Sequence, residues 1–378
     1  MTFHLNIFLS GPNNSTGTVP KQLGPSPISS SPTNVRRMKR HTIKDIAARL
    51  KVSTSTVSRA FNDAYDIKKE TRELILKTAK EMNYHPNPIA RKLAQKRSFN
   101  IGVVVPEFIN EYYAEVILGI QDFLFTTGYQ VLIMQSNNDP AIELESVKTL
   151  MQNRMDGIII CPSMKGENMN YYAEKINKGY AIIFLNRIEQ AFPAQKVIFN
   201  NWKSCFFATE HLIYEGYKKI YHLAGKDNLG ITKDRTKGFI DAMKKHHFTD
   251  RDYKVIETGI LPERAMAIVQ LLIDQNDLPE AFICVSDLIA LSTICILKQN
   301  GLSVPGDIGV TGFTETRTAN LVSPKLTSVK QPTFEMGKIA AEMLINTIHG
   351  EDNLSDTIIL DGTLNIRESS LKQEYGVR

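Results

Sequence analysis

The chain has 378 residues, of which 42% are hydrophobic and 22% charged, a composition typical of a globular protein with two or three domains. The net charge of +5 is unevenly distributed, because residues 38–97 contain 15 Lys and Arg against 6 Asp and Glu, whereas residues 98–378 contain 27 against 34. No apolar run approaches the roughly 18 residues that span a bilayer, and the four cysteines stand singly without histidine partners. We therefore expect a soluble, cytoplasmic protein with buried thiols and without a metal or cofactor.

Residues 1–37 are rich in Ser, Pro, Gly and Asn, a composition typical of disorder. Their first apolar stretch lacks a basic leader and a small-residue cleavage site, so no secretory signal is expected. Met38 directly precedes a well-organised segment and is a candidate for the true start of translation. We interpret residues 1–37 as a disordered leader or as sequence upstream of that start.

Residues 38–86 are predicted to form a small basic domain of three helices. Thr42 and Asp45 approximate a capping box at the start of the first helix, and Ser53 can cap the second. A third amphipathic segment lies near residues 69–82. The apolar spacing of the three segments predicts a core made of Ile43, Ile46, Ala47, Leu50, Val57, Ala60, Phe61, Leu74, Ile75, Ala79 and Met82.

The second of these helices carries Thr54, Ser55, Ser58 and Arg59 on the face opposite to its apolar residues. Two short helices joined by a tight turn form a helix-turn-helix, whose second helix can enter the major groove of DNA. Hydroxyl groups can bond phosphates or base edges, and an arginine can donate two hydrogen bonds to guanine. An ordinary solvated helical face is the alternative, which the basic charge of this segment disfavours.

Residues 87–98 are predicted to form a short hinge helix, because Asn87 is a good N-cap and Pro88 fits the first helical position. So short a helix is not stable alone in water, so we expect it to fold only against DNA or a partner. Leu93 stands among four Lys and Arg residues, as expected of a wedge inserted into a minor-groove step. Packing of this segment against the following domain is the alternative.

Residues 99–378 alternate between apolar, strand-like runs and helical patterns such as residues 111–127 and 141–154. Such alternation predicts parallel sheets covered by helices on both faces. The strand-like runs fall into two series, which predicts two lobes, with ligands bound beyond the carboxyl ends of the strands. The expected fold is therefore an α-helical helix-turn-helix head followed by a two-lobed α/β domain.

Two stretches of the head carry a specific resemblance. The sequences TIKDIAARLKVSTSTVSRAFN, which starts at Thr42, and TRELILKTAKEMNYHPNPIARKL, which starts at Thr71, resemble the lactose-repressor (LacI/GalR) family of bacterial transcription regulators. The large domain is similar to the regulatory domain of that family, which resembles periplasmic sugar-binding proteins. The resemblance covers essentially all of residues 40–370.

The resemblance implies that Thr54, Ser55 and Arg59 match base-reading positions and that Leu93 matches the hinge leucine inserted at the centre of a palindromic operator. Lys51 departs from the glycine usual in the turn, which carries a cost if that position needs a positive φ. With flanking residues included, the candidate DNA-binding set is Thr42, Ser53, Thr54, Ser55, Thr56, Ser58, Arg59, Asn62, Ala90, Arg91 and Leu93.

In the large domain, Arg235 resembles the effector-binding arginine of the family and Asp287 its paired acid, which would hold ligand hydroxyls by charge-assisted hydrogen bonds. Simpler alternatives are that Asp287 is a helix N-cap, that Arg235 forms a surface ion pair and that Trp202 packs in the core rather than acting as a lid. The candidate effector-binding set is Tyr112, Tyr113, Asn186, Arg187, Trp202, Arg235 and Asp287, with the two tyrosines as candidates for stacking on a sugar ring.

Two departures from the family pattern reduce the acidity expected at this cleft. Residues 312–315 read Gly-Phe-Thr-Glu where the family commonly has G-F/Y-D-D near the third crossing between lobes, and Asn200-Asn201 stands where Asp-Asn is frequent. The sequence from Leu326 onward, LTSVKQPTFEMGKIAAEML, resembles the last crossing and the helix after it. The effector therefore cannot be copied from a known sugar repressor, although a sugar or sugar phosphate is expected before a nucleobase.

The resemblance implies a DNA-binding transcriptional regulator, with repression the expected outcome, whose operator affinity is controlled by a carbohydrate-like effector. It also implies a homodimer that places two heads on the two half-sites of double-stranded operator DNA. The alternative is a periplasmic-type solute-binding protein without a regulatory role, which would need an export signal and would have no use for residues 40–97. No enzymatic activity is expected, because G-x-S-x-G, Walker A, G-x-G-x-x-G and H-E-x-x-H motifs are absent.

Overall fold

The structure is a computed structural model that describes residues 41–61, 67–84, 97–163, 166–189, 191–226, 230–351 and 357–372. The predictions for the leader, Met38, Asn62, Ala90, Arg91 and Leu93 lie outside these residues, as does most of the predicted hinge. Two compact units meet in sequence at residues 87 and 88, and each is described by itself. Within the described ranges, no helix is both long and apolar enough to cross a membrane.

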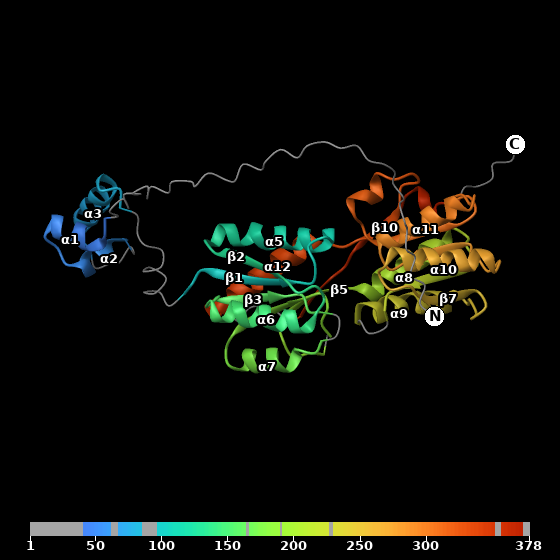
Figure 1. The fold of residues 1–378 in the computed structure, drawn as a ribbon, viewed down its shortest axis with the longest axis horizontal. Coiled ribbons are helices and arrows are strands. Elements are labelled where there is room, and N and C mark those ends of the chain that lie inside the picture. Colours follow the sequence, from blue (N-terminus) through green and yellow to red (C-terminus); the bar gives the residue numbers. More distant parts are fainter. Residues whose placement is uncertain are drawn as a thin grey trace, which may run out of the picture. The chain divides into compact units, whose positions relative to one another are not determined.

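The described part of the smaller unit contains three helices, α1 (Ile43–Leu50), α2 (Thr54–Phe61) and α3 (Lys69–Glu81), shown in blue in Figure 1. Its core is formed by buried aliphatic side chains from all three helices, and burial of each isoleucine or valine among them contributes roughly 1.5–3 kcal/mol. The buried members are Ile46, Ala47, Val57, Ala60, Ile75 and Ala79. This unit therefore has its own core.

The helix ends of the smaller unit follow the predicted capping chemistry. The backbone N–H of Thr42 donates to Oδ2 of Asp45 at 2.6 Å, and the backbone N–H of Thr56 donates to Oγ of Ser53 at 3.0 Å. Lys51 ends α1 with φ of 54°. This left-handed conformation favours glycine, so the lysine adopts a strained backbone conformation, as expected from the sequence.

The prediction of the core is wrong for one residue. Leu74 is 52% exposed, and Thr78 is buried instead. The inward face of α3 runs through Ile75, Thr78, Ala79 and Met82 at i, i+3, i+4 and i+7, and the 100° rotation per residue turns Leu74 away from it. The Thr78 hydroxyl donates to the carbonyl of Leu74 at 2.8 Å, which satisfies the only polar group of this face.

The larger unit is built from two lobes. In the first lobe all strand pairs are parallel, in the order β11-β5-β4-β3-β1-β2. Helices α5 and α12 cover one face and helices α6 and α7 the other (Figure 1). The elements are β1 (Asn100–Val105), α5 (Glu111–Thr127), β2 (Gln130–Gln135), α6 (Pro140–Gln152), β3 (Gly157–Ile160), α7 (Met169–Asn177), β4 (Ala181–Leu185), β5 (Lys196–Phe199), α12 (Thr333–His349) and β11 (Thr357–Leu360).

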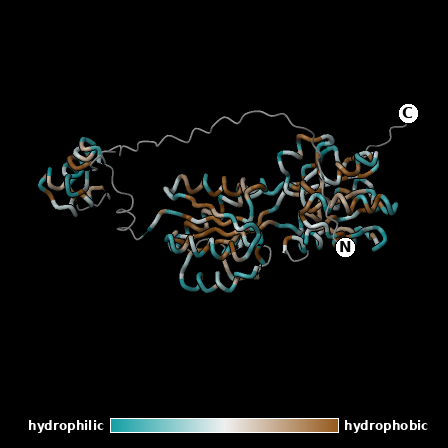
Figure 2. The backbone as a smooth tube through the Cα atoms, in the orientation of Figure 1, coloured by the Kyte–Doolittle hydropathy of each residue, from teal (hydrophilic) through white to brown (hydrophobic). Residues whose placement is uncertain are grey.

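The second lobe has the strand order β12-β10-β9-β8-β6-β7, in which only the β10–β12 pair is antiparallel. Helices α8 and α9 cover one face of this sheet, and helices α10 and α11 cover the other. In both lobes, the most hydrophobic stretches of the chain lie in the central strands (Figure 2). The elements are α8 (Asn201–Tyr214), β6 (Ile220–Ala224), α9 (Gly230–Lys245), β7 (Tyr253–Glu257), α10 (Pro262–Asp274), β8 (Ala281–Cys284), α11 (Asp287–Gln299), β9 (Gly309–Thr314), η1 (Arg317–Asn320), β10 (Thr327–Lys330), β12 (Thr363–Asn365) and η2 (Glu368–Ser370).

The chain passes between the lobes after β5, after β10 and after β11. The resemblance implies a place near the third crossing for residues 312–315, but residues 312–314 end β9 inside the second sheet and Glu315 follows it. The passage from β10 to α12 is the second crossing rather than the last, and the last is at Asp361 and Gly362. One further expectation is wrong, because Cys295 on α11 is exposed whereas the other three cysteines are buried.

Candidate DNA-binding surface and effector site

The outer face of α2 presents Thr54, Ser55 and Arg59 as exposed side chains. The hydroxyl of Ser53 lies 2.7 Å from that of Ser55 and 2.8 Å from that of Thr56, so the cap residue also orders the start of this face. Of the remaining candidates, Thr42 is an exposed helix cap and Ser58 is half-buried. The surface can therefore offer several hydroxyl groups and one guanidinium group to a polyanion.

Helix α2 is held in place by contacts with α3 and the residues after it. Nε of Arg72 donates to the carbonyl of Ala60 at 3.2 Å, and the rings of Phe61 and Tyr84 lie 5.5 Å apart. These contacts fix the carboxyl-terminal end of α2, while the Ser53 cap fixes its beginning. A rigid helix can present its outer face without a further ordering cost.

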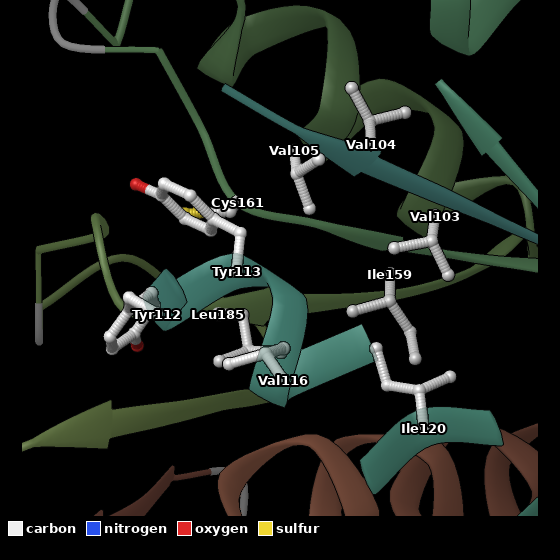
Figure 3. A pocket seen from close by; sticks show the side chains of 10 residues that line it. All are labelled: Val103, Val104, Val105, Tyr112, Tyr113, Val116, Ile120, Ile159, Cys161 and Leu185. Atoms are coloured by element: carbon white, nitrogen blue, oxygen red, sulfur yellow. The ribbon is translucent and has the colours of Figure 1, made fainter. Parts of the chain in front are cut away.

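The two candidate tyrosines are buried at the start of α5, which follows β1. The rings of Tyr112 and Tyr113 pack edge to face at 5.1 Å, and Oη of Tyr113 lies 3.9 Å from Sγ of Cys161. Figure 3 shows both rings at one end of a small pocket whose other lining residues are mostly aliphatic. Burial raises the pKa of both phenols well above its ordinary value. The ring faces predicted to stack on a sugar are covered in this structure.

Asn186 and Arg187 directly follow β4, at the carboxyl end of the first sheet. The guanidinium carbon of Arg187 lies 5.7 Å from the ring centroid of Tyr113, and its Nη1 donates to the side chain of Asn138. Two buried atoms, Nε of Arg187 and Oδ1 of Asn186, have no hydrogen-bond partner among the described residues. Buried polar groups are rarely left unpaired, so these atoms are candidates for ligand contacts.

Arg235 projects from α9 and is only 6% exposed. Its Nε donates to Oδ1 of Asn201 at 2.9 Å, and its Nη1 donates to the carbonyl of Val285 at 2.6 Å. The guanidinium carbon lies 3.7 Å from the ring centroid of Phe313. Burial lowers the pKa of Arg235 to about 10, so the group stays charged at neutral pH. The alternative of a surface ion pair is wrong, because the side chain is buried.

Asp287 is 1% exposed and ties α11 to β10 and to the residues after β9. Its Oδ2 accepts from the backbone N–H of Thr316 at 2.6 Å and from the hydroxyl of Thr316 at 3.1 Å, and its Oδ1 accepts from the hydroxyl of Ser328 at 2.5 Å. The N-cap of α11 is Ser286, so the N-cap alternative for Asp287 is wrong. Asp287 and Arg235 bond different groups rather than each other.

The buried position of Asp287 shifts its pKa and restricts which residue can stand at position 312. Burial raises the pKa of Asp287 to about 6, against the three hydrogen bonds that lower it. A Cβ atom at Gly312 would lie 2.3 Å from Oδ1 of Asp287, so this position of β9 accepts only glycine without a shift of the carboxylate.

We expect the variant Asp287→Asn to be more stable than the unsubstituted protein above pH 6 and to lose this advantage toward pH 4. A carboxyl whose pKa is raised from about 4 to about 6 on folding weakens the folded state progressively as pH rises through that window, by about 3 kcal/mol in full. Asparagine can accept from Thr316 and donate to Ser328. The measurement is the difference in melting temperature between the two proteins from pH 4 to pH 8.

Asp307→Asn is the matched control for this experiment. The hydrogen bonds from Ser303 lower the pKa of Asp307, so its loss should cost stability above pH 4 and the sign of the effect is opposite. A difference for Asp287→Asn that is constant across the pH range would contradict the raised pKa.

Trp202 lies near the start of α8 and is 37% exposed. Its ring stacks on Phe206 at 5.2 Å, and its Nε1 donates to Oδ2 of Asp241 on α9 at 2.8 Å. A Cβ atom at Gly238 would lie 2.3 Å from the carbonyl oxygen of Trp202, so α8 and α9 approach closely here. The tryptophan is thus fixed at the contact of two helices and is half exposed, not buried in the core.

Sequence reasoning missed several groups around this site. Asn201 bonds Arg235, and Thr316 and Ser328 bond Asp287. Only Asn201 stood out in the sequence, as a departure from the family pattern. A polar cavity of about 190 Å³ was also missed, because its lining comes from segments far apart in the chain. Its lining residues are Glu115, Thr314, Glu315, Thr316, Arg317, Asn320, Lys330 and Gln331.

The two units match the two models of one protein family. Residues 42–87 match the model described as bacterial regulatory proteins, lacI family, and residues 98–368 match the periplasmic binding proteins and sugar binding domain of the LacI family. The chain belongs to the LacI family. Its membership identifies a DNA-binding transcriptional regulator whose operator affinity is controlled by a small-molecule effector. The alternative of a solute-binding protein without a regulatory role is not supported.

Relatives of this LacI-family protein are similar over nearly their whole length. Catabolite control protein A of Priestia megaterium is 29% identical over 332 residues, which are 87% of this chain and 99% of the relative. The solved lac repressor dimer bound to operator and the anti-inducer ONPF shares the fold, with a TM-score of 0.78 and 24% identity over 88% of this chain and 100% of the other. The regulator CelR, solved as a cellobiose complex, has a TM-score of 0.64 and 25% identity, over 87% and 100%. These relatives are transcriptional regulators rather than enzymes.

Proposed function

We propose that this protein is a cytoplasmic repressor that binds a palindromic operator as a homodimer and responds to a sugar or sugar derivative. The observation that carries the DNA-binding part is the outer face of α2, where Thr54, Ser55 and Arg59 are exposed on a helix fixed at both ends. The relative solved with cellobiose supports a carbohydrate effector, and the relative solved as a dimer on its operator supports two heads on two half-sites.

The proposed division of the chain follows the sequence pattern. Residues 38–86 are the DNA-binding domain, residues 87–98 the hinge and residues 99–378 the effector-binding and dimerisation domain. In the head, Thr54, Ser55 and Arg59 would contact base edges, while the other candidates of α1 and α2 would bond phosphates. In the hinge, Leu93 would be inserted between base pairs, with Ala90 and Arg91 beside it.

The effector would act on DNA binding through the angle between the two lobes. The chain crosses between them three times, so a ligand that bonds strand ends of both lobes changes the preferred angle between them. A changed angle would separate the two hinge segments of the dimer and unfold the helix that carries Leu93. A coupling free energy of about 1–3 kcal/mol is enough for useful regulation.

The test of this function is to mix the purified protein with sheared DNA of its own genome at moderate salt and to sequence what is retained, with and without a panel of sugars. We expect recovery of a short palindrome, because two symmetric heads read two half-sites. We also expect one sugar to change the amount retained. Retention of DNA without any shared sequence would contradict a specific operator and leave only the general attraction of a basic head to DNA.

A further inference from the structure

We propose that the effector carries a negatively charged group, a carboxylate or a phosphate, that is held by Arg187 and Arg235. This inference rests on the proposed function, because it concerns the ligand of the effector site. It narrows the class of ligand from sugars in general to acidic sugar derivatives.

The first observation is that two guanidinium groups, the buried one of Arg235 and the half-buried one of Arg187, lack an acidic partner. Among the described residues, neither Arg187 nor Arg235 has a carboxylate within 4.0 Å. The groups that bond them are neutral: the amides of Asn138 and Asn201 and the carbonyl of Val285. A buried charge without an opposite charge is costly, and proteins normally pair such groups.

The second observation is that the charges of Arg187 and Arg235 act on the same buried phenol, that of Tyr112, and that Arg187 also acts on Arg235. The charges of Arg187 and Arg235 both oppose the rise in the pKa of Tyr112 that burial causes. Burial is the main cause of the lowered pKa of Arg235, and repulsion by Arg187 adds to it. Arg187 follows a strand of the first lobe, whereas Arg235 projects from a helix of the second. An anion that reaches both would relieve their repulsion and join the two lobes.

The acids of the surrounding segments form no ion pair with either arginine among the described residues. Asp234 on α9 acts on Arg235 only from a distance. The carboxylate of Asp287 already accepts three hydrogen bonds from Thr316 and Ser328. Glu107 acts on Arg187 only from a distance, since it makes no ion pair with it. The residue directly after β4 is the neutral Asn186, and the last residue of β9 is the neutral Thr314.

The unpaired atoms indicate what else the ligand carries. Nε of Arg187 is a donor without an acceptor, as expected of a fork that awaits a carboxylate or phosphate oxygen. Oδ1 of Asn186 is an acceptor without a donor, as expected of an atom that awaits a hydroxyl group. A compound with both an anionic group and hydroxyl groups satisfies both, and sugar acids and sugar phosphates are of this kind.

The experiment compares matched pairs of compounds on the full-length protein at constant ionic strength. The pairs are galactose with galacturonate, glucose with glucuronate, glucose with glucose 6-phosphate and ribose with ribose 5-phosphate, and inorganic phosphate is tested alone. Binding is followed by melting temperature and by the fluorescence of Trp202, the only tryptophan, whose neighbour Asn201 bonds Arg235. We expect at least one acid to bind about tenfold or more tightly than its neutral parent. The carboxylate and phosphate pairs distinguish the two sources of charge.

Variants test the two arginines separately. Arg187→Gln and Arg235→Gln should each remove the preference for the acid over its neutral parent, while Arg235→Lys keeps part of it. Arg264→Gln, which removes an exposed guanidinium of α10 paired with Glu257, is the matched control and should keep the full preference. If Arg235→Gln fails to fold, Arg187→Gln still decides, because its side chain makes a single hydrogen bond to a loop residue.

Two outcomes would overturn the proposal. The first is that neutral sugars bind as tightly as their acids. The second is that neither an acid nor inorganic phosphate shifts the melting temperature. Operator binding without ligand is measured beside these tests, so a failure of the anion site is distinguishable from a failure of the regulator.

Discussion

Replacing Arg59 by alanine is expected to lower the affinity for the operator by about 10- to 100-fold while leaving binding to random DNA nearly unchanged. The arginine is exposed on the outer face of α2, where its guanidinium can donate two hydrogen bonds to one guanine. Such a bidentate contact is worth about 1–3 kcal/mol of discrimination. The measurement is fluorescence anisotropy with the recovered operator and with a scrambled duplex of equal length.

Lys77→Ala is the control for Arg59→Ala. Lys77 is exposed on α3, so its removal takes away one positive charge without touching the face of α2. We expect a small loss that is the same for operator and scrambled DNA. An equal loss on both duplexes for Arg59→Ala would show instead that Arg59 bonds a phosphate and reads no base.

Gly337→Ala is expected to destabilise the first lobe by about 2–3 kcal/mol. A Cβ atom at Gly337 of α12 would lie 2.1 Å from the carbonyl oxygen of Val116 on α5, and one at Gly119 would lie 1.9 Å from the carbonyl oxygen of Phe334. Both contacts are with backbone, which cannot turn aside as a side chain can, so the helices would have to separate. Urea unfolding of the variant and of the unsubstituted protein measures the loss.

Gly230→Ala is the matched control for Gly337→Ala. No atom lies within 4 Å of the Cβ that would be added at this first residue of α9. Stability should be unchanged or slightly higher, because alanine favours a helix more than glycine does. Equal stability of the two variants would mean that α5 and α12 do not pack as closely as described.

The sequence predicted elements well where strong local signals bracket them. Helix α5 runs from Glu111 to Thr127 as expected, because Asn110 caps its start and Gly128 ends it in the left-handed conformation. The four strands that were not predicted are short: β5, β10 and β11 contain four residues each and β12 contains three. They pair with one another across long stretches of chain, β5 with β11 and β10 with β12. The order of the crossings depends on the same distant pairing.

The sequence predicted which residues belong to the effector site but not which groups form hydrogen bonds with them. Asn186 directly follows β4 and Asp287 begins α11 after β8, as expected, because the run of apolar residues before each fixes where its strand stops. The groups that hold Asp287 come from β10 and from the residues after β9, and the groups that hold Arg235 come from α8 and from the residue after β8. No local pattern joins such distant segments, so the bonding of the charged groups became visible only in the folded chain.

The interleaving of the two lobes also determines the order in which the protein can mature during translation. The first lobe needs α12, whose Met336, Ala340 and Leu344 belong to its core, yet α12 is encoded after nearly all of the second lobe. Residues 43–81, by contrast, have their own small core and can fold soon after leaving the ribosome. A polypeptide that terminates before residue 333 would therefore carry a complete head but an unfinished first lobe. Nonsense mutations over a long stretch of the gene would therefore produce fragments that bind DNA but do not respond to the effector.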